Sequence, residues 1–97
     1  MAPPVTMVTK IGSGHGSFPP TAIIEGSGNT TVNSLKVARV GDKLAPHGSP
    51  SPSPPHGRAI AKGSLKTRVN SLDSARIGDP INCGGLVATG SYNTRFG

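Results

Sequence analysis

The chain has 97 residues, of which 33% are hydrophobic and 3% aromatic, with no tryptophan. A chain of this length has a limited core, so we expect residues 1–97 to form a single domain that needs stabilisation beyond side-chain burial. Ten lysines and arginines against four acidic residues give a net charge of +6, but they are scattered along the chain and aromatic stacking platforms are scarce, which argues against nucleic-acid binding.

The first ten residues, MAPPVTMVTK, contain no apolar stretch of the kind found in a signal peptide, so no cleaved signal is expected. Together the 14 glycines and 10 prolines approach the composition of disordered chains. Only 14% of the residues are charged, however, and valine, isoleucine and leucine recur in short runs between turn residues. We therefore predict an all-β fold of short strands and tight turns.

The first copy of a repeated unit spans Val32–Gly48 (VNSLKVARVGDKLAPHG), and a hairpin is predicted within residues 30–40 (TTVNSLKVARV). Asn33-Ser34 separates two apolar runs, and asparagine tolerates the left-handed backbone of a two-residue hairpin turn. Gly41-Asp42 is expected to end the second strand, because glycine permits unusual backbone angles and aspartate bonds to nearby amides.

A proline-serine run follows at Ala45–Gly57 (APHGSPSPSPPHG), with one His-Gly pair near each end. So many prolines exclude a helix or a central strand. We interpret the run as a loop that brings His47 and His56 together.

The second copy, Val69–Gly85 (VNSLDSARIGDPINCGG), repeats the first at an offset of 37 residues, with 9 of 17 positions identical, and places a second hairpin turn at Asn70-Ser71. Gly90 begins a third copy that the end of the chain interrupts. The segment Thr9–Gly16 (TKIGSGHG) is matched as a degenerate copy, with Thr9-Lys10 in place of Ala-Arg and Ser13 in place of the aspartate. One structural unit is therefore predicted to be used about three times.

Asp42 and Asp79 could be read as a pair of catalytic carboxylates. They occupy the same place in their two copies of the repeat. This equivalence favours turn residues over a catalytic pair.

The three histidines and the single cysteine all fall in equivalent turns of the repeat, or in the loop attached to one. Hairpins that stand side by side would bring these turns to one end of the molecule. Three imidazoles and a thiolate form a closed ligand set for Zn²⁺, and iron is the alternative because imidazole suits both metals. The predicted ligands are His15, His47, His56 and Cys83. Their spacing matches no zinc-finger motif, so solvated surface histidines stay open as an alternative.

A hydrolytic zinc would need an open coordination position and a nearby general base. All three histidines are assigned as ligands, and Glu25, the only glutamate, lies just ahead of the Gly26-Ser27 strand start. The site is therefore predicted to be structural, and the protein is predicted not to be an enzyme. A zinc-dependent hydrolase is the least favoured of the alternatives.

The Gly-Ser strand starts, the asparagine turns, the elements KVAR and DSAR and the following Gly-Asp together resemble the PAAR-repeat family. The resemblance covers essentially the whole chain. It implies a small cone of short β-hairpins, pinned by a zinc ion near its apex and seated on a trimeric β-helical spike. It also implies a non-enzymatic tip that sharpens the tail spike of a contractile, T4-like phage for piercing the bacterial envelope. The alternative is an adaptor that attaches effectors to a type VI secretion spike.

Three Gly-Ser starts, at Gly26, Gly63 and Gly90, predict an approximate threefold character at the end away from the metal turns. One copy is therefore expected to dock on each spike trimer. The predicted spike contacts are Val32, Leu35, Val69, Leu72 and Phe96. The expected location is the tip of the virion's tail spike, assembled in the host cytoplasm, with transient contact with the bacterial outer membrane.

Overall fold

The computed structural model describes residues 3–14, 19–47, 56–82 and 84–95, and these residues form only short strands, bridges and turns. The strands are β1 (Ile11–Gly12), β2 (Thr21–Ala22), β3 (Thr31–Val32), β4 (Leu35–Lys36), β5 (Lys43–His47), β6 (His56–Ala59), β7 (Arg68–Val69) and β8 (Leu72–Asp73). They pair as antiparallel hairpins, β1 with β2, β3 with β4, β5 with β6 and β7 with β8. The all-β prediction is confirmed. Among the described residues, no helix is long and apolar enough to cross a membrane.

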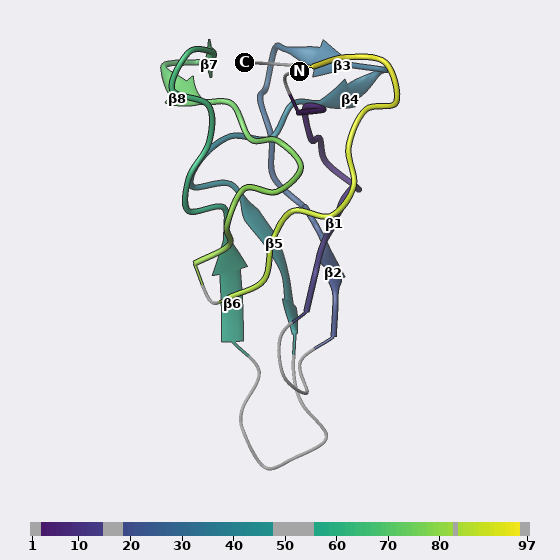
Figure 1. The fold of residues 1–97 in the computed structure, drawn as a ribbon, viewed down its shortest axis with the longest axis vertical. Helices are drawn as coiled ribbons and strands as arrows, with labels where there is room; N and C mark the ends of the chain where they lie inside the picture. The colour runs from purple at the N-terminus through teal and green to yellow at the C-terminus, as the bar shows by residue number, and fades with distance from the viewer. Residues whose placement is uncertain (1–2, 15–18, 48–55, 83, 96–97) are drawn as a thin grey trace.

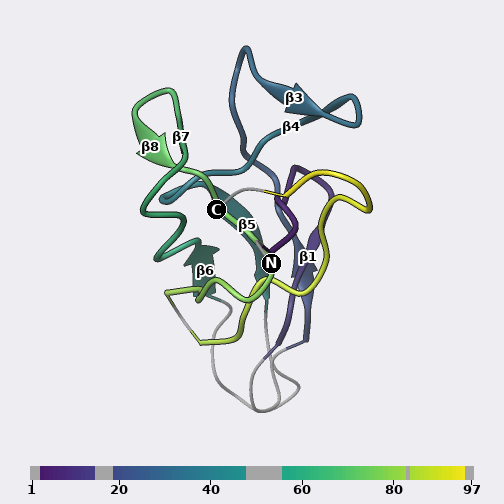
Figure 2. The same cartoon turned by 45° about the horizontal axis from the view of Figure 1, so that its top comes forward.

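The molecule is elongated, 40 × 27 × 21 Å, and Figure 1 shows how the hairpins are distributed along it. The β3–β4 and β7–β8 hairpins lie at the wide end, whereas β1, β2, β5 and β6 run toward the narrow end. With the wide end brought forward, the two hairpins are seen at separate places around it (Figure 2). We call the wide end the base.

The two hairpins of the base have the turns that the sequence predicts. Asn33 and Ser34 have φ angles of 52° and 66°, and Asn70 and Ser71 have φ angles of 55° and 67°. Two consecutive left-handed residues are the signature of a type I′ turn, whose twist matches that of antiparallel strands. The hairpins are therefore closed by local turn chemistry.

Three copies of one short segment meet around an approximate threefold axis. They are residues 5–10, 37–42 and 74–79. The amide of Ala38 donates to the carbonyl of Thr6 (3.1 Å), that of Ala75 to Ala38 (3.0 Å), and that of Thr6 to Ala75 (3.0 Å). All three residues are fully buried. The three bonds form a closed ring, so each copy of the repeat holds the next.

The ring shows that the first copy lies three residues earlier in the chain than the sequence comparison predicts. Thr6-Met7 stands in the Ala-Arg place, because Thr6 completes the ring with Ala38 and Ala75. The assignment of Thr9-Lys10 to that place was therefore wrong. The sequence comparison chose the wrong register because Thr6-Met7 has no residue in common with Ala-Arg. In addition, Ile11-Gly12 resembles the Val-Gly and Ile-Gly pairs of the other copies.

The turn that follows supports the same register. Thr9 has a φ of 81°, next to values of 91° at Gly41 and 92° at Gly78. Lys10 then stands at the aspartate position, which the sequence comparison assigns wrongly to Ser13.

Two segments from opposite parts of the chain, around Pro4 and Arg95, pair at the base in the way that the strands of the two hairpins do. Pro4 and Arg95 form an antiparallel bridge. The amide of Val5 donates to the Thr94 carbonyl at 3.0 Å, and the amide of Ser91 donates to the Val5 carbonyl at 2.7 Å. Equivalent bonds flank the β3–β4 and β7–β8 hairpins. The third copy, which looks interrupted in the sequence, is completed by the N-terminal segment.

The described core consists of two apolar clusters. One contains Val5, Met7, Val37 and Val69, and the other contains Ile23, Ala38, Leu44, Ile60, Ala75, Ile81 and Val87. A Cβ added at Gly12 would collide with methyl groups of Leu44 and Ile81. The small residue contributed by the first copy therefore makes room for the large residues of the other two, which is how imperfect repeats fill one core.

Candidate functional site

Two of the predicted metal ligands lie opposite each other in the β5–β6 hairpin. The register pairs His47 with His56, after a shift between Leu44 and His47. Only the backbone of these two histidines is described, and His15 and Cys83 lie outside the described residues. The four-ligand set therefore stays a prediction.

The segment that leads to Cys83 is tied to the strand that carries His56. Ala59 ends β6, and its amide donates to Oδ1 of Asn82 at 3.0 Å. In return the amide of Asn82 donates to the Ala59 carbonyl at 2.9 Å. The residue immediately before the cysteine is thus fixed to the second strand of the histidine hairpin.

The segment that leads to His15 is tied in turn to the chain beyond Cys83. The amide of Ser13 donates to the Leu86 carbonyl at 2.8 Å, and the amide of Leu86 donates to Oγ of Ser13, also at 2.8 Å. Described neighbours of all four predicted ligands therefore belong to one hydrogen-bonded group of segments.

The donor set suits the ion that the sequence predicts. Three imidazoles and one thiolate supply the nitrogen and sulfur ligands that Zn²⁺ prefers. Within the part of the chain that the structure describes, no group of three or more His, Cys, Asp or Glu side chains could hold a metal ion.

Asp42 and Asp79 act as turn residues. Oδ2 of Asp42 accepts hydrogen bonds from the amide and from Nε of Arg39, both at 2.8 Å. Oδ2 of Asp79 accepts from the amide of Arg76 at 2.7 Å and from its Nε at 3.3 Å. The hydrogen bond with Asp42 raises the pKa of Arg39 above its ordinary value. Each carboxylate is occupied by its own turn, which supports the structural role predicted for both aspartates.

The predicted spike contacts differ in how accessible they are. Val32 and Leu35 are partly buried and pack against the cluster that includes Val69. Val69 itself is 6% exposed, whereas Leu72 is 41% exposed. Phe96 lies outside the described residues. In the chain alone, Val69 belongs to the core and Leu72 to the surface.

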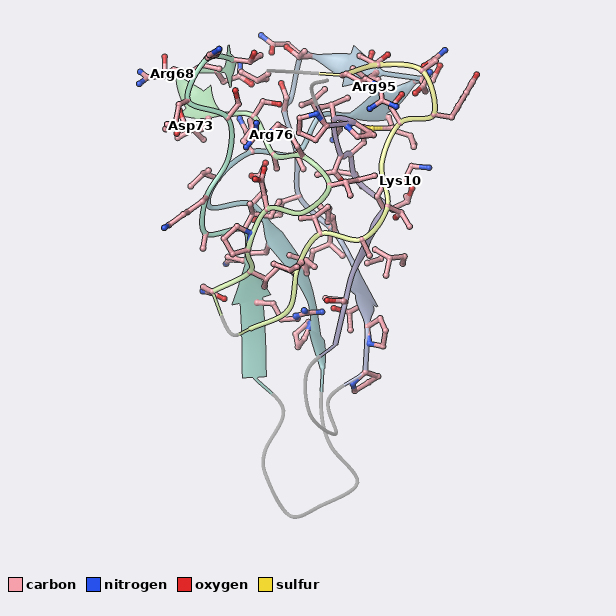
Figure 3. The ribbon with its side chains drawn as sticks, in the orientation of Figure 1. Lys10, Arg68, Asp73, Arg76 and Arg95 are labelled. Carbon is pink, nitrogen blue, oxygen red and sulfur yellow. The ribbon has the colours of Figure 1, made fainter. Side chains whose placement is uncertain are left out.

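Among the described residues, sequence reasoning missed the two most exposed large hydrophobic side chains. Leu65 is 91% exposed and Tyr92 is 88% exposed. Each follows a Gly-Ser strand start, and Gly28 holds the same place in the remaining copy. Their segments belong to the base, where Figure 3 labels Arg68 and Arg95. The third position of the Gly-Ser-x motif was the signal that could have revealed them.

The described residues thus form a small all-β fold in which repeated hairpins are arranged around an approximate threefold axis. The profile of the PAAR motif family matches residues 13–89, and the chain belongs to this family. None of the curated proteins gives a significant match. Proteins of this family are non-catalytic tips that sharpen the trimeric spike of type VI secretion systems and phage tails, and they often bind zinc. The protein is therefore not an enzyme.

Proposed function

We propose that one copy of this chain caps the trimeric β-helical spike of a contractile phage tail and forms the point that pierces the bacterial envelope. The observation that carries the proposal is the threefold arrangement of the base, closed by the ring of Thr6, Ala38 and Ala75. A chain with three similar units can meet three identical spike chains at once. We further propose that residues 1–97 act as one domain, and the antiparallel bridge between Pro4 and Arg95 supports this.

The docking surface centres on exposed apolar side chains of the base. Leu65, Tyr92 and Leu72 provide apolar area that is exposed in the chain alone. Partly buried Val32 and Leu35 support this surface and pack against the cluster that contains Val69. Phe96 stays a predicted contact outside the described residues. Large apolar side chains at a surface of this kind are typical anchors of a protein interface.

One metal ion stiffens the narrow end. His15, His47, His56 and Cys83 would hold Zn²⁺, with iron as the alternative. When bound, the ion supplies a cross-link among turns that lie far apart in the sequence, and such a link contributes to folding free energy. The pairs Ser13–Leu86 and Ala59–Asn82 keep the segments beside these ligands together. The narrow end therefore resists fraying under axial force as it transiently meets the outer membrane.

The second candidate is an adaptor that links an effector to a type VI secretion spike. It uses the same base, so the fold favours neither setting. Neighbouring tail genes would support the virion as the location, whereas a neighbouring effector and immunity pair would support the adaptor.

The test is a co-purification with the trimeric spike protein of the same system, weighed by light scattering. We expect one copy of this chain per three spike chains. Leu65→Asp and Tyr92→Asp should each weaken the complex at least tenfold. Leu86→Asp is the matched control, since Leu86 is also exposed (51%) but is bonded to Ser13 near the predicted ligands. Three copies per spike, or binding lost only in the control, would refute this docking.

A further inference from the structure

An arginine occupies the interior of the narrow half of the molecule. Arg58, in β6, is 2% exposed and has the largest fully buried side chain of the described residues. Arginine is almost never fully buried unless its guanidinium is bonded, because burial removes the hydration of its charge. A function for this side chain must therefore be sought in its partners.

The guanidinium bridges to the opposite strands. Nη1 donates to the carbonyl of Gly12 at 3.3 Å and to Oγ1 of Thr21 at 3.0 Å. Nη2 donates to the carbonyl of Ser13. A Cβ added at Gly85 would lie 3.1 Å from Nη2. The Arg58 side chain thus bonds to β1 and to Ser13, which follows β1. It also bonds to β2 and lies close to the turn after Cys83.

These contacts occur between equivalent positions of the three repeats. The amides of Ile23, Ile60 and Val87 make equivalent hydrogen bonds, to the carbonyls of Lys10, Asp42 and Asp79 respectively. Two residues before each of the three donors stand Thr21, Arg58 and Gly85. One repeat therefore contributes a long side chain that reaches segments of the other two, and those two contribute smaller residues that leave room for it.

We propose that Arg58 is a positioning residue that holds the metal-bearing segments in register before any metal binds. Its strand carries His56, its acceptors Gly12 and Ser13 lead to His15, and Gly85 follows Cys83 by two residues. The guanidinium offers several donors in a fixed fork, so it can hold separate carbonyls at once. Pre-ordered segments reduce the entropy that metal binding must overcome. This inference rests on the proposed metal site.

The experiment compares Arg58→Met and Arg58→Lys with the parent. Arg68→Met is the matched control, because Arg68 is a 69% exposed side chain of the base that pairs with Asp73 at 3.3 Å. Amide hydrogen exchange is measured on the metal-free proteins, and zinc affinity is measured by competition with a chromophoric chelator.

Arg58→Met should speed exchange at the amides of Ser13 and Leu86 while the ring amides of Ala38 and Ala75 keep their protection. It should also weaken zinc binding by about 10–100-fold, the usual effect of losing a residue that orients metal ligands. Arg58→Lys should be intermediate and Arg68→Met unchanged. Parent-like exchange and affinity in folded Arg58→Met would overturn the proposal.

If Arg58→Met does not fold, Thr21→Val tests the same link. It removes one acceptor of the guanidinium without changing the shape of the side chain. Faster exchange at Ser13 in this variant supports the proposal, and unchanged exchange contradicts it. Hydrogen exchange is measured on the metal-free protein, so it tests the role of Arg58 separately from metal binding. A parent protein that binds no zinc would refute the metal site. The exchange rates would then still show whether Arg58 holds these segments together.

Discussion

Thr9 and Gly41 both have a positive φ at equivalent places in two copies of the repeat. Their φ angles are 81° and 91°, and their amides donate to the carbonyls of Ile23 and Ile60, both at 2.9 Å. A β-branched residue is costly at positive φ, because its Cβ crowds the backbone. The ring of repeats therefore imposes this turn on the first copy even though its sequence does not favour it.

Gly41→Ala should destabilise the protein by about 1–2 kcal/mol through backbone strain. A Cβ at Gly41 would meet no atom within 4 Å, so packing contributes nothing to this cost. Gly28→Ala is the control, because Gly28 has equal space and no positive φ. Urea unfolding measures both variants. A Gly41→Ala loss no larger than that of the control would show that the positive φ carries no strain.

Thr9→Asn should stabilise the protein by about 0.5–1 kcal/mol, since asparagine tolerates left-handed backbone better than threonine does. Thr9 is exposed, so no packing is lost. The free energy of unfolding, again from urea titration, checks the sign. Loss of stability would contradict the conformation assigned to this residue.

Lys10→Asp should stabilise the protein by about 1 kcal/mol, the usual net value of a hydrogen bond. The new carboxylate would stand where Asp42 accepts the amide of Arg39 at 2.8 Å, and would accept the amide of Met7 in the same way. Ser13→Asp is the control for the other register, and it should destabilise because Oγ of Ser13 accepts the amide of Leu86. Thermal melts compare the two. A higher melting temperature for Ser13→Asp than for Lys10→Asp would support the alignment in which Ser13 holds the aspartate position.

Ser91→Ala should cost about 1–2 kcal/mol, similar to Ser27→Ala. Oγ of Ser91 accepts the amide of Thr94 at 2.9 Å, and Oγ of Ser27 accepts the amide of Thr30 at 3.0 Å. Chemical denaturation of the two variants compares a hairpin built from both chain ends with a continuous one. A negligible cost at Ser91 beside a full cost at Ser27 would mean that the composite hairpin frays in solution.

Metal removal should lower the melting temperature, because the ion cross-links the predicted turns. Native mass spectrometry should show one Zn²⁺ per chain, and elemental analysis distinguishes zinc from iron. Cys83→Ser, His47→Ala and His15→Ala should each cost on the order of 3 kcal/mol or more. His56→Ala should cost less, since water can replace a ligand next to the proline-serine run. Melts that overlay the parent in all four variants would show that the ligand assignment is wrong.

Local chemistry was readable from the sequence. Asn33-Ser34 and Asn70-Ser71 form the predicted turns, and Asp42 and Asp79 cap their own turns as expected. In each case a few adjacent residues determine the backbone, because the side chain bonds to amides within its own turn. The repeat and its family resemblance rest on the same local motifs.

Tertiary structure decided how the copies join. Thr6 takes the ring position that is alanine in the other two copies. Its hydroxyl donates at 2.8 Å to the carbonyl of Thr89, which lies 83 residues away in the chain. The burial of Arg58 depends likewise on room left by Thr21 and Gly85. No local pattern encodes such contacts, because they exist only once three imperfect repeats close around a common axis.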